Sequence, residues 1–150
     1  MIKNPGEISL DEALLICQET LKKGRSENFM PLTVVVIDVA GVIRATLSEE
    51  GSSIVRPDIA YAKAWSCLAY GASTNTIRDI LEDQPRLDKA FTGMQTMAGG
   101  KLIPTPGGII IQKDEKNIGA VGVSGDRSAQ DEICAIAGVE SAGLIASHSS

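Results

Sequence analysis

The pattern of apolar and polar positions predicts two β-hairpins. Residues 33–38 are almost entirely β-branched, and residues 42–47 follow a short turn with partial alternation of apolar and polar side chains. A continuous apolar run is typical of a strand covered on both faces, whereas alternation is typical of a strand closer to a sheet edge. Two further apolar runs, 107–112 and 118–125, flank a charged turn at 113–117. These loops are too short for crossover helices, so the paired strands are expected to be antiparallel.

Capping and stop signals predict helices on either side of the first hairpin. Ser9 and Glu12 have the spacing of a capping box at the start of an amphipathic helix of about four turns, which Gly24 is expected to end. Pro57 suits the first turn of a second helix, and Gly71 is placed to end it. One helix therefore precedes the first hairpin and another follows it.

Weaker helical signals lie between the two hairpins. Ser73 or Thr74 is expected to cap a short helix that runs through Leu81, and residues 86–97 are expected to form a further helical piece. The glycine- and proline-rich segment 98–108 is expected to be a shaped loop with room for a short strand. The hairpins and helices together predict an α+β fold, an antiparallel sheet covered by helices.

The last predicted strand carries glycine at every third position, Gly119, Gly122 and Gly125. Glycine weakens a strand interior unless something must approach the backbone closely, and either a packed helix or a bound ligand would supply that reason. The helix that follows begins near Ser128, for which Asp131 is the expected capping partner. Its buried side consists of small residues, so it is expected to pack closely on the sheet.

Length and composition limit the classes of protein. The 150 residues are expected to form one domain, 1–150, and the net charge of −5 with scattered basic residues and 3% aromatics argues against nucleic acid as a partner. No apolar run suits a signal peptide or a membrane span, so no membrane partner and a cytoplasmic location are expected. Cys17, Cys67 and Cys134 lack metal-binding spacing and are expected to be buried, reduced thiols.

Three charged residues are the candidates for chemistry. Asp38 ends an apolar strand at a turn, where an Asx-turn and a ligand or catalytic role are the alternatives. Lys63 interrupts an apolar helix face, and it could extend to the surface, pair with a carboxylate such as Asp38, or be a desolvated amine of lowered pKa. Asp131 is either a helix cap or an acid or base. The single histidine, His148, lies in the tail, so no catalytic triad and no metal site are expected.

Several motifs in order resemble the GlcG/HbpS family over nearly the whole chain. They are Val36-Ile37-Asp38-x-x-Gly41, Ile59-Ala60-x-x-Lys63-Ala64, Gly107-Gly108 before a strand, and Ile118-Gly119-Ala120-Val121-Gly122-Val123-Ser124-Gly125 with Asp131 and Ala137-Gly138. The resemblance implies a profilin-like α/β/α sandwich around a five-stranded antiparallel sheet, and homo-oligomers built from it. It also implies haem binding in some members, attachment to a corrinoid adenosyltransferase (PduO) in others, and links to small-acid catabolic operons.

The sequence departs from this family at two places. Haem-binding relatives use a histidine as iron ligand, whereas His148 lies at no motif position, which leaves Cys17, Cys67, Met94 or Met97 as substitutes. Where relatives carry an Arg-x-Asp-Gly-Ala-like segment after the second strand, this chain has Leu47-Ser48-Glu49-Glu50-Gly51. No cofactor is therefore certain, and haem is one ligand that the family implies.

Two functions follow from the sequence. The first is an oligomeric, non-catalytic binding module for haem or a small organic acid, linked to a catabolic pathway. The second is a cofactor-free isomerase, hydratase or lyase, in which Lys63 or Asp38 transfers a proton and helix-end amides hold an oxyanion. The residues expected to bind the ligand are Asp38, Arg44, Lys63, Gly107, Gly108, Ser124, Gly125 and Asp131.

Overall fold

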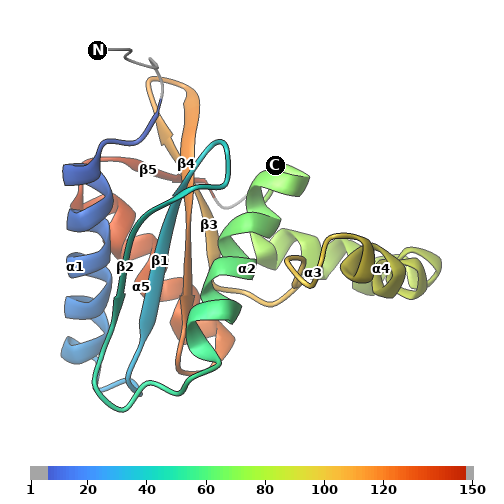
Figure 1. The fold of residues 1–150 in the computed structure, drawn as a ribbon, viewed down its shortest axis with the longest axis horizontal. Coiled ribbons are helices and arrows are strands. Elements are labelled where there is room, and N and C mark those ends of the chain that lie inside the picture. The colour runs from blue at the N-terminus through green and yellow to red at the C-terminus, as the bar shows by residue number, and fades with distance from the viewer. Residues whose placement is uncertain (1–6, 148–150) are drawn as a thin grey trace.

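Five antiparallel strands form one sheet at the centre of the protein (Figure 1). A computed structural model describes residues 7–147. The strand order is β2-β1-β4-β3-β5. The strands are β1 (Thr33–Asp38), β2 (Ile43–Ser48), β3 (Gly108–Lys113), β4 (Lys116–Ser124) and β5 (Ile145–Ser147).

Helices cover both faces of this sheet, which gives the expected α/β/α sandwich and confirms the α+β fold. The helices are α1 (Leu10–Ser26), α2 (Arg56–Tyr70), α3 (Thr74–Asp83), α4 (Pro85–Met97) and α5 (Ser128–Ser141). Helices α1 and α5 lie side by side on one face, and α2 lies on the other. Helices α3 and α4 extend away from the sheet on the α2 side (Figure 1) and enclose a small cluster of their own around Ile77, Leu81 and Phe91.

The two hairpins follow the apolar pattern. All of β1 is buried, whereas exposure alternates along the second half of β2, the strand at the sheet edge. Strands β3 and β4 are joined at Asp114 and Glu115, whose φ angles of 50° and 62° are those of a tight hairpin turn. Strand β5, which pairs with β3 through Ile111 and Ala146, has no signal in the pattern. It supplies the fifth strand that the family resemblance implies.

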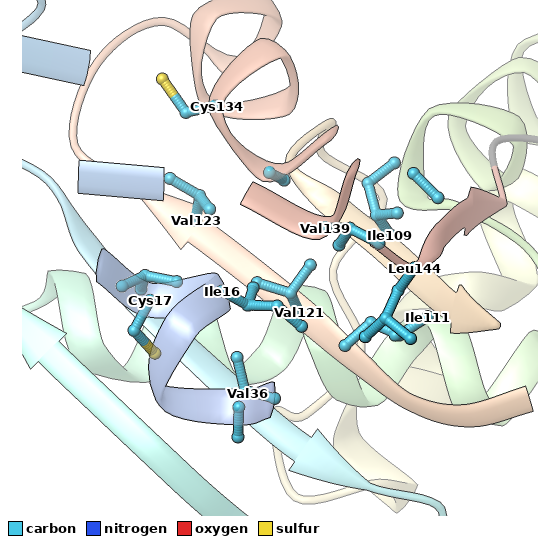
Figure 2. Close-up of a cluster of buried hydrophobic side chains, with 14 of the residues drawn as sticks. Ile16, Cys17, Val36, Ile109, Ile111, Val121, Val123, Cys134, Val139 and Leu144 are labelled. Atoms are coloured by element: carbon cyan, nitrogen blue, oxygen red, sulfur yellow. The ribbon is translucent and has the colours of Figure 1, made fainter. Parts of the chain in front are cut away.

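The larger core lies between the sheet and helices α1 and α5 (Figure 2). Ile16 and Cys17 of α1 and Val139 of α5 pack there against strand residues such as Val36 and Val121, all of them fully buried. A smaller core on the opposite face contains side chains of β1, β3 and β4 under α2. This alternation of strand residues between two cores is the physical reason that β1 is apolar at nearly every position.

The glycines of β4 bring α2 against the sheet. A β-carbon at Gly122 would lie 1.8 Å from the carbonyl oxygen of Ala60 in α2, and one at Gly119 would lie 2.3 Å from the carbonyl oxygen of Ile37. Of the two explanations for these glycines, a packed helix is correct at Gly122. The packed helix is α2, and the closing helix α5 lies on the other face.

Two helix boundaries differ from the sequence prediction. Helix α1 has the expected capping box of Ser9 and Glu12 but continues past Gly24 to Ser26. Gly24 is buried inside the helix because Leu32 occupies the space beside it, where a β-carbon would lie 2.6 Å from Leu32 Cδ1. Helix α5 begins at Ser128 as expected, but no side chain caps it, so the predicted capping role of Asp131 is wrong.

The remaining helix signals are correct. Pro57 lies in the first turn of α2, Gly71 ends that helix with φ 66°, and the side chain of Ser73 caps α3 through the amide of Thr76. No strand forms between residues 98 and 107, where the sequence left room for one.

Candidate functional site

Lys63 and Asp131 form an ion pair inside the protein. Helix α2 directs the Lys63 ammonium into the space between β4 and α5, where Nζ donates to Asp131 Oδ2 at 2.9 Å and to the Val123 carbonyl oxygen at 2.8 Å. The side chains are only 2% and 1% exposed. Two of the three alternatives for Lys63 are correct: it pairs with a carboxylate, which is Asp131 and not Asp38, and it is a desolvated amine of lowered pKa.

Burial controls the ionisation of this pair. Removal from water is the largest influence on Lys63 and lowers its pKa below the ordinary 10.5, against the opposing charge of Asp131. The same effect raises the pKa of Asp131 above 3.8, although Lys63 opposes it. The second carboxylate oxygen of Asp131 accepts the amide of Asp126 at 3.0 Å, so both oxygens are bound to protein. The arrangement fits a structural connection between α2 and α5.

Glycines allow the backbone to pack closely beside this ion pair. Gly107 has φ 124°, and a β-carbon there would lie 2.8 Å from Lys63 Nζ. The amide of Gly108 donates to Thr74 Oγ1 at 2.9 Å. Gly125 lies against the Pro31 carbonyl oxygen, 2.3 Å from where its β-carbon would be. Three of the expected ligand-binding glycines are therefore in contact with the protein's own side chains and backbone.

Ser124 and Arg56 lie at the edge of the same cluster. Arg56 Nη1 donates to Ser124 Oγ at 3.2 Å, and Arg56 is half-buried whereas Ser124 is fully buried. The sequence analysis did not select Arg56, whose only signal is its place just before Pro57. The structure thus brings Lys63, Gly107, Ser124 and Asp131 together at one end of the sheet.

Asp38 lies elsewhere. In the sheet Asp38 pairs with Gly119, while Val123 pairs with Val34, four residues and about 13 Å further along β1. Asp38 Oδ1 accepts the amides of Ala40 and Val42, which confirms the predicted Asx-turn. Its other oxygen accepts Arg44 Nε at 2.7 Å. Asp38 and Lys63 thus have different partners, and a pairing of Lys63 with Asp38 is excluded.

The environment of Asp38 favours its charged form. Burial alone would raise its pKa, but hydrogen bonds from Val42, Arg44 and Ala40 outweigh burial and hold the pKa below the ordinary 3.8. The Asp38 side chain is 1% exposed, and the Arg44 side chain is 40% exposed. Arg44 also approaches Glu7 at 3.8 Å. Of the expected ligand-binding residues, only Asp38 and Arg44 lie at this turn.

A pocket of about 230 Å³ opens between that turn and α2. It is lined by Val39, Ala40, Gly41, Trp65, Leu68 and Ala69. The hydroxyl of Tyr61 donates to the Gly41 carbonyl oxygen at 3.2 Å and holds the turn against the helix. The sequence analysis did not select Trp65, although a single tryptophan in a chain with 3% aromatics was an available signal.

Residues 7–147 contain no histidine, and their three thiols are unsuited to ligate a haem iron. Cys17, Cys67 and Cys134 are fully buried, as expected, and burial raises the pKa of each thiol to about 12. The Met94 sulfur accepts the Tyr70 hydroxyl at 3.1 Å, and Met97 is 83% exposed. His148 lies outside the described residues. In the described part of the chain, no group of three histidine, cysteine, aspartate or glutamate side chains could hold a metal ion.

Known proteins are similar to this chain in sequence and in fold. It is 28% identical over 102 residues to the corrinoid adenosyltransferase PduO of Salmonella typhimurium, a match that covers 68% of this chain and 29% of that protein. The chain thus spans less than a third of the length of that curated relative. Within residues 7–147, no helix is long and apolar enough to cross a lipid bilayer.

Two solved structures have the same arrangement of elements. The PduOC–haem complex superposes with a TM-score of 0.82 at 22% identity and covers 95% of this chain and 99% of that one. The ORFY protein of Klebsiella pneumoniae superposes with a TM-score of 0.80 at 25% identity, over 95% and 98% of the two chains. The model of the haem-degrading-protein HbpS-like family matches residues 8–140, from the residue before the capping box to the last turn of α5. The family resemblance in the motifs is therefore confirmed, and the chain belongs to the HbpS-like family.

Proposed function

We propose that this chain is a non-catalytic, small-molecule-binding module of the HbpS-like family. Family membership supports this proposal, because the PduOC relative is known as a haem complex. The module is a single domain, 1–150, that acts in the cytoplasm as a homo-oligomer and serves a catabolic pathway. Its ligand is haem or a small organic acid.

One observation carries the proposal: both candidate catalytic side chains are already hydrogen-bonded to other groups of the protein. Lys63 Nζ donates to a carboxylate and to a carbonyl oxygen, and the Lys63 side chain is only 2% exposed to solvent. Both oxygens of Asp38 accept hydrogen bonds that shape a turn. A general acid or base must reach the substrate proton at hydrogen-bond distance, and neither group is free to do so. The enzyme hypothesis thus has less support than the binding module.

The two ligand classes differ in how well they fit the described residues. Haem in this chain would lack a thiolate ligand, because all three thiols are buried with pKa values of about 12. A small organic acid needs only an apolar surface and a nearby cation or donor. Asp38 begins the turn that borders the 230 Å³ pocket, and Arg44 of β2 donates to Asp38. We interpret the other expected ligand-binding residues, around Lys63 and Asp131, as support for the fold.

Hemin titration tests the haem form of the proposal. Hemin is added to the purified chain, and the Soret band is compared with that of hemin in buffer and with that of the Met97→Leu variant. A Soret shift that Met97→Leu removes would assign haem binding through a thioether. An unshifted band with heat released by small carboxylic acids in calorimetry would assign the organic-acid form. Absence of both signals would overturn the binding module.

Turnover assays test the enzyme alternative. The chain is incubated with small hydroxy and unsaturated acids and compared with a Lys63→Met variant whose fold is verified by circular dichroism. Wild-type turnover that disappears in this variant would overturn the non-catalytic proposal.

A further inference from the structure

The pocket beside Trp65 combines an apolar lining with unused polar groups. Val39, Leu68 and Ala69 contribute apolar side chains, and Val39 is 47% exposed. Exposed apolar surface gathered in a concave site is typical of ligand pockets. Its volume of about 230 Å³ lies below the roughly 300–1,000 Å³ of pockets for drug-sized ligands. A small organic molecule fits such a volume, and a haem does not.

Trp65 presents a hydrogen-bond donor to this pocket. The indole edge faces the turn, because a β-carbon at Gly41 would lie 3.5 Å from Trp65 Cδ1 and 3.6 Å from Nε1. Within residues 7–147, the indole N–H donates to no protein acceptor, and because Trp65 is half-buried this N–H is accessible to a ligand. Gly41 has φ 81°, a conformation that favours glycine, and glycine leaves this point of the turn without a side chain.

Lys101 adds a positive charge to the same ring. Its ammonium lies 5.0 Å from the centroid of the Trp65 ring, a cation–π distance. No carboxylate in the described part of the chain forms an ion pair with Lys101, and Lys101 itself is exposed. The pocket therefore offers an apolar lining and one N–H donor, and the Lys101 ammonium, which is not part of the lining, lies over the Trp65 ring that borders the pocket. This combination matches an anion with an apolar body.

We infer that the Trp65 pocket binds a small organic acid, whose apolar body lies between the Val39–Gly41 turn and α2 and whose carboxylate pairs with Lys101. This inference rests on the proposed binding function and names its ligand class and site. The Asx-turn of Asp38 then has an indirect role, because it shapes one wall of the pocket.

Trp65 is the only tryptophan of the chain, so its fluorescence reports directly on the pocket. Benzoate is titrated into the purified protein and compared with benzyl alcohol, a ligand of similar size without charge. Two variants separate the contributions of the lining and the charge. Ala69→Leu fills the pocket from an exposed position in α2, and Lys101→Gln removes the ammonium. Lys89→Gln, on the exposed side of α4, is the matched control for charge.

The expected result is a saturable change in Trp65 emission with benzoate. Lys101→Gln weakens benzoate binding at least fivefold and leaves benzyl alcohol binding unchanged, Ala69→Leu abolishes the response to both, and Lys89→Gln alters neither. Circular dichroism and the melting temperature verify that each variant is folded. Equal affinities of wild type for benzoate and benzyl alcohol would overturn the assignment of an acid.

Other outcomes separate this inference from the function on which it rests. Heat of benzoate binding in calorimetry that Ala69→Leu does not change would place the ligand elsewhere, which overturns the pocket but preserves the binding module. No heat and no fluorescence change with benzoate or with hemin would overturn both. Emission that changes when the ligand-free protein is diluted would show that a second copy of the chain covers Trp65, and would overturn the pocket as a small-molecule site.

Discussion

Lys63 of α2 and Asp131 of α5 are 68 residues apart in sequence, and their charged atoms lie 2.9 Å apart in the interior. Each belongs to a helix on a different face of the sheet, and the pair joins the two layers beyond the end of β4. The Val123 carbonyl oxygen and the Asp126 amide complete its hydrogen bonds. The contact explains why a lysine occupies an otherwise apolar helix face.

Removing one partner of this ion pair should destabilise the protein more than replacing both partners with apolar residues. Lys63→Met leaves a buried carboxylate without its partner and should lower the free energy of unfolding by about 3–5 kcal/mol. The double variant Lys63→Met/Asp131→Leu should recover most of that loss, because neither charge is then buried alone. Urea unfolding of both variants measures the difference, with Lys22→Met, at an exposed position of α1, as the control. A single variant as stable as Lys22→Met would contradict a structural role for the pair.

The same substitution should change how stability depends on pH. Burial already raises the pKa of Asp131, and loss of Lys63 removes the charge that opposes the rise. A carboxyl group with a raised pKa in the folded state contributes stability that is present at low pH and lost as pH rises through that pKa. The unfolding free energy of Lys63→Met relative to wild type should therefore increase when the pH falls from 7 to 5. Urea titrations at these pH values test this, and a constant difference would exclude protonation of Asp131.

Asp38 should stabilise the protein above its pKa and cease to do so at acidic pH. Its pKa is lowered in the folded protein, so its contribution is present above the ordinary value of 3.8 and is lost as pH falls through the lower, folded pKa. Asp38→Asn should lower stability by about 1–3 kcal/mol at pH 7, because Arg44 loses a charged acceptor. It should also flatten the decline of stability below pH 4. Asp114→Asn, in the exposed β3–β4 turn, is the control and should leave that decline unchanged.

Two glycine substitutions should change the free energy of unfolding in opposite directions. At Gly122 a β-carbon would lie 1.8 Å from the Ala60 carbonyl oxygen, so Gly122→Ala must displace α2 and should cost about 3 kcal/mol or more. At Gly93, in α4, a β-carbon would meet nothing within 4 Å, and Gly93→Ala should stabilise by about 1 kcal/mol through helix propensity. Calorimetric melting should show a decrease of about 6 °C or more for the first and an increase of about 2–4 °C for the second. Equal effects would mean that α2 does not pack tightly on β4.

Thiol reactivity tests the burial of the cysteines. The chain has three, each buried with a pKa of about 12, so almost no thiolate is present at pH 8. Ellman's reagent should label none of them in the native protein within minutes and all three in guanidinium chloride. Rapid labelling of any one under native conditions would reopen thiolate ligation of haem.

Local signals in the sequence were sufficient for most of the elements. The Ser9–Glu12 capping box, the β-branched run of β1 and the charged turn of the second hairpin depend on residues close together in the chain, so propensity and periodicity reveal them. The motifs that resemble the GlcG/HbpS family were readable for the same reason. Strand β5 was not, because three residues acquire strand geometry only by pairing with β3.

The candidate site depended on contacts between distant segments. The sequence placed Lys63 on an apolar face and Asp38 at a turn, but it could not reveal that Lys63 meets Asp131, since helices α2 and α5 approach each other only after the sheet forms. Trp65 likewise became part of a pocket only when the Asp38 turn folded against α2.

By itself, then, the sequence determined the order of helices and strands, the antiparallel hairpins and the family, because short-range sterics and burial patterns decide these. The tertiary structure alone decided which charges meet, which helix packs on the glycines of β4 and where a pocket remains open. Those features arise from the packing of the α2 and α5 layers on opposite faces of the sheet, and no stretch of neighbouring residues contains that information.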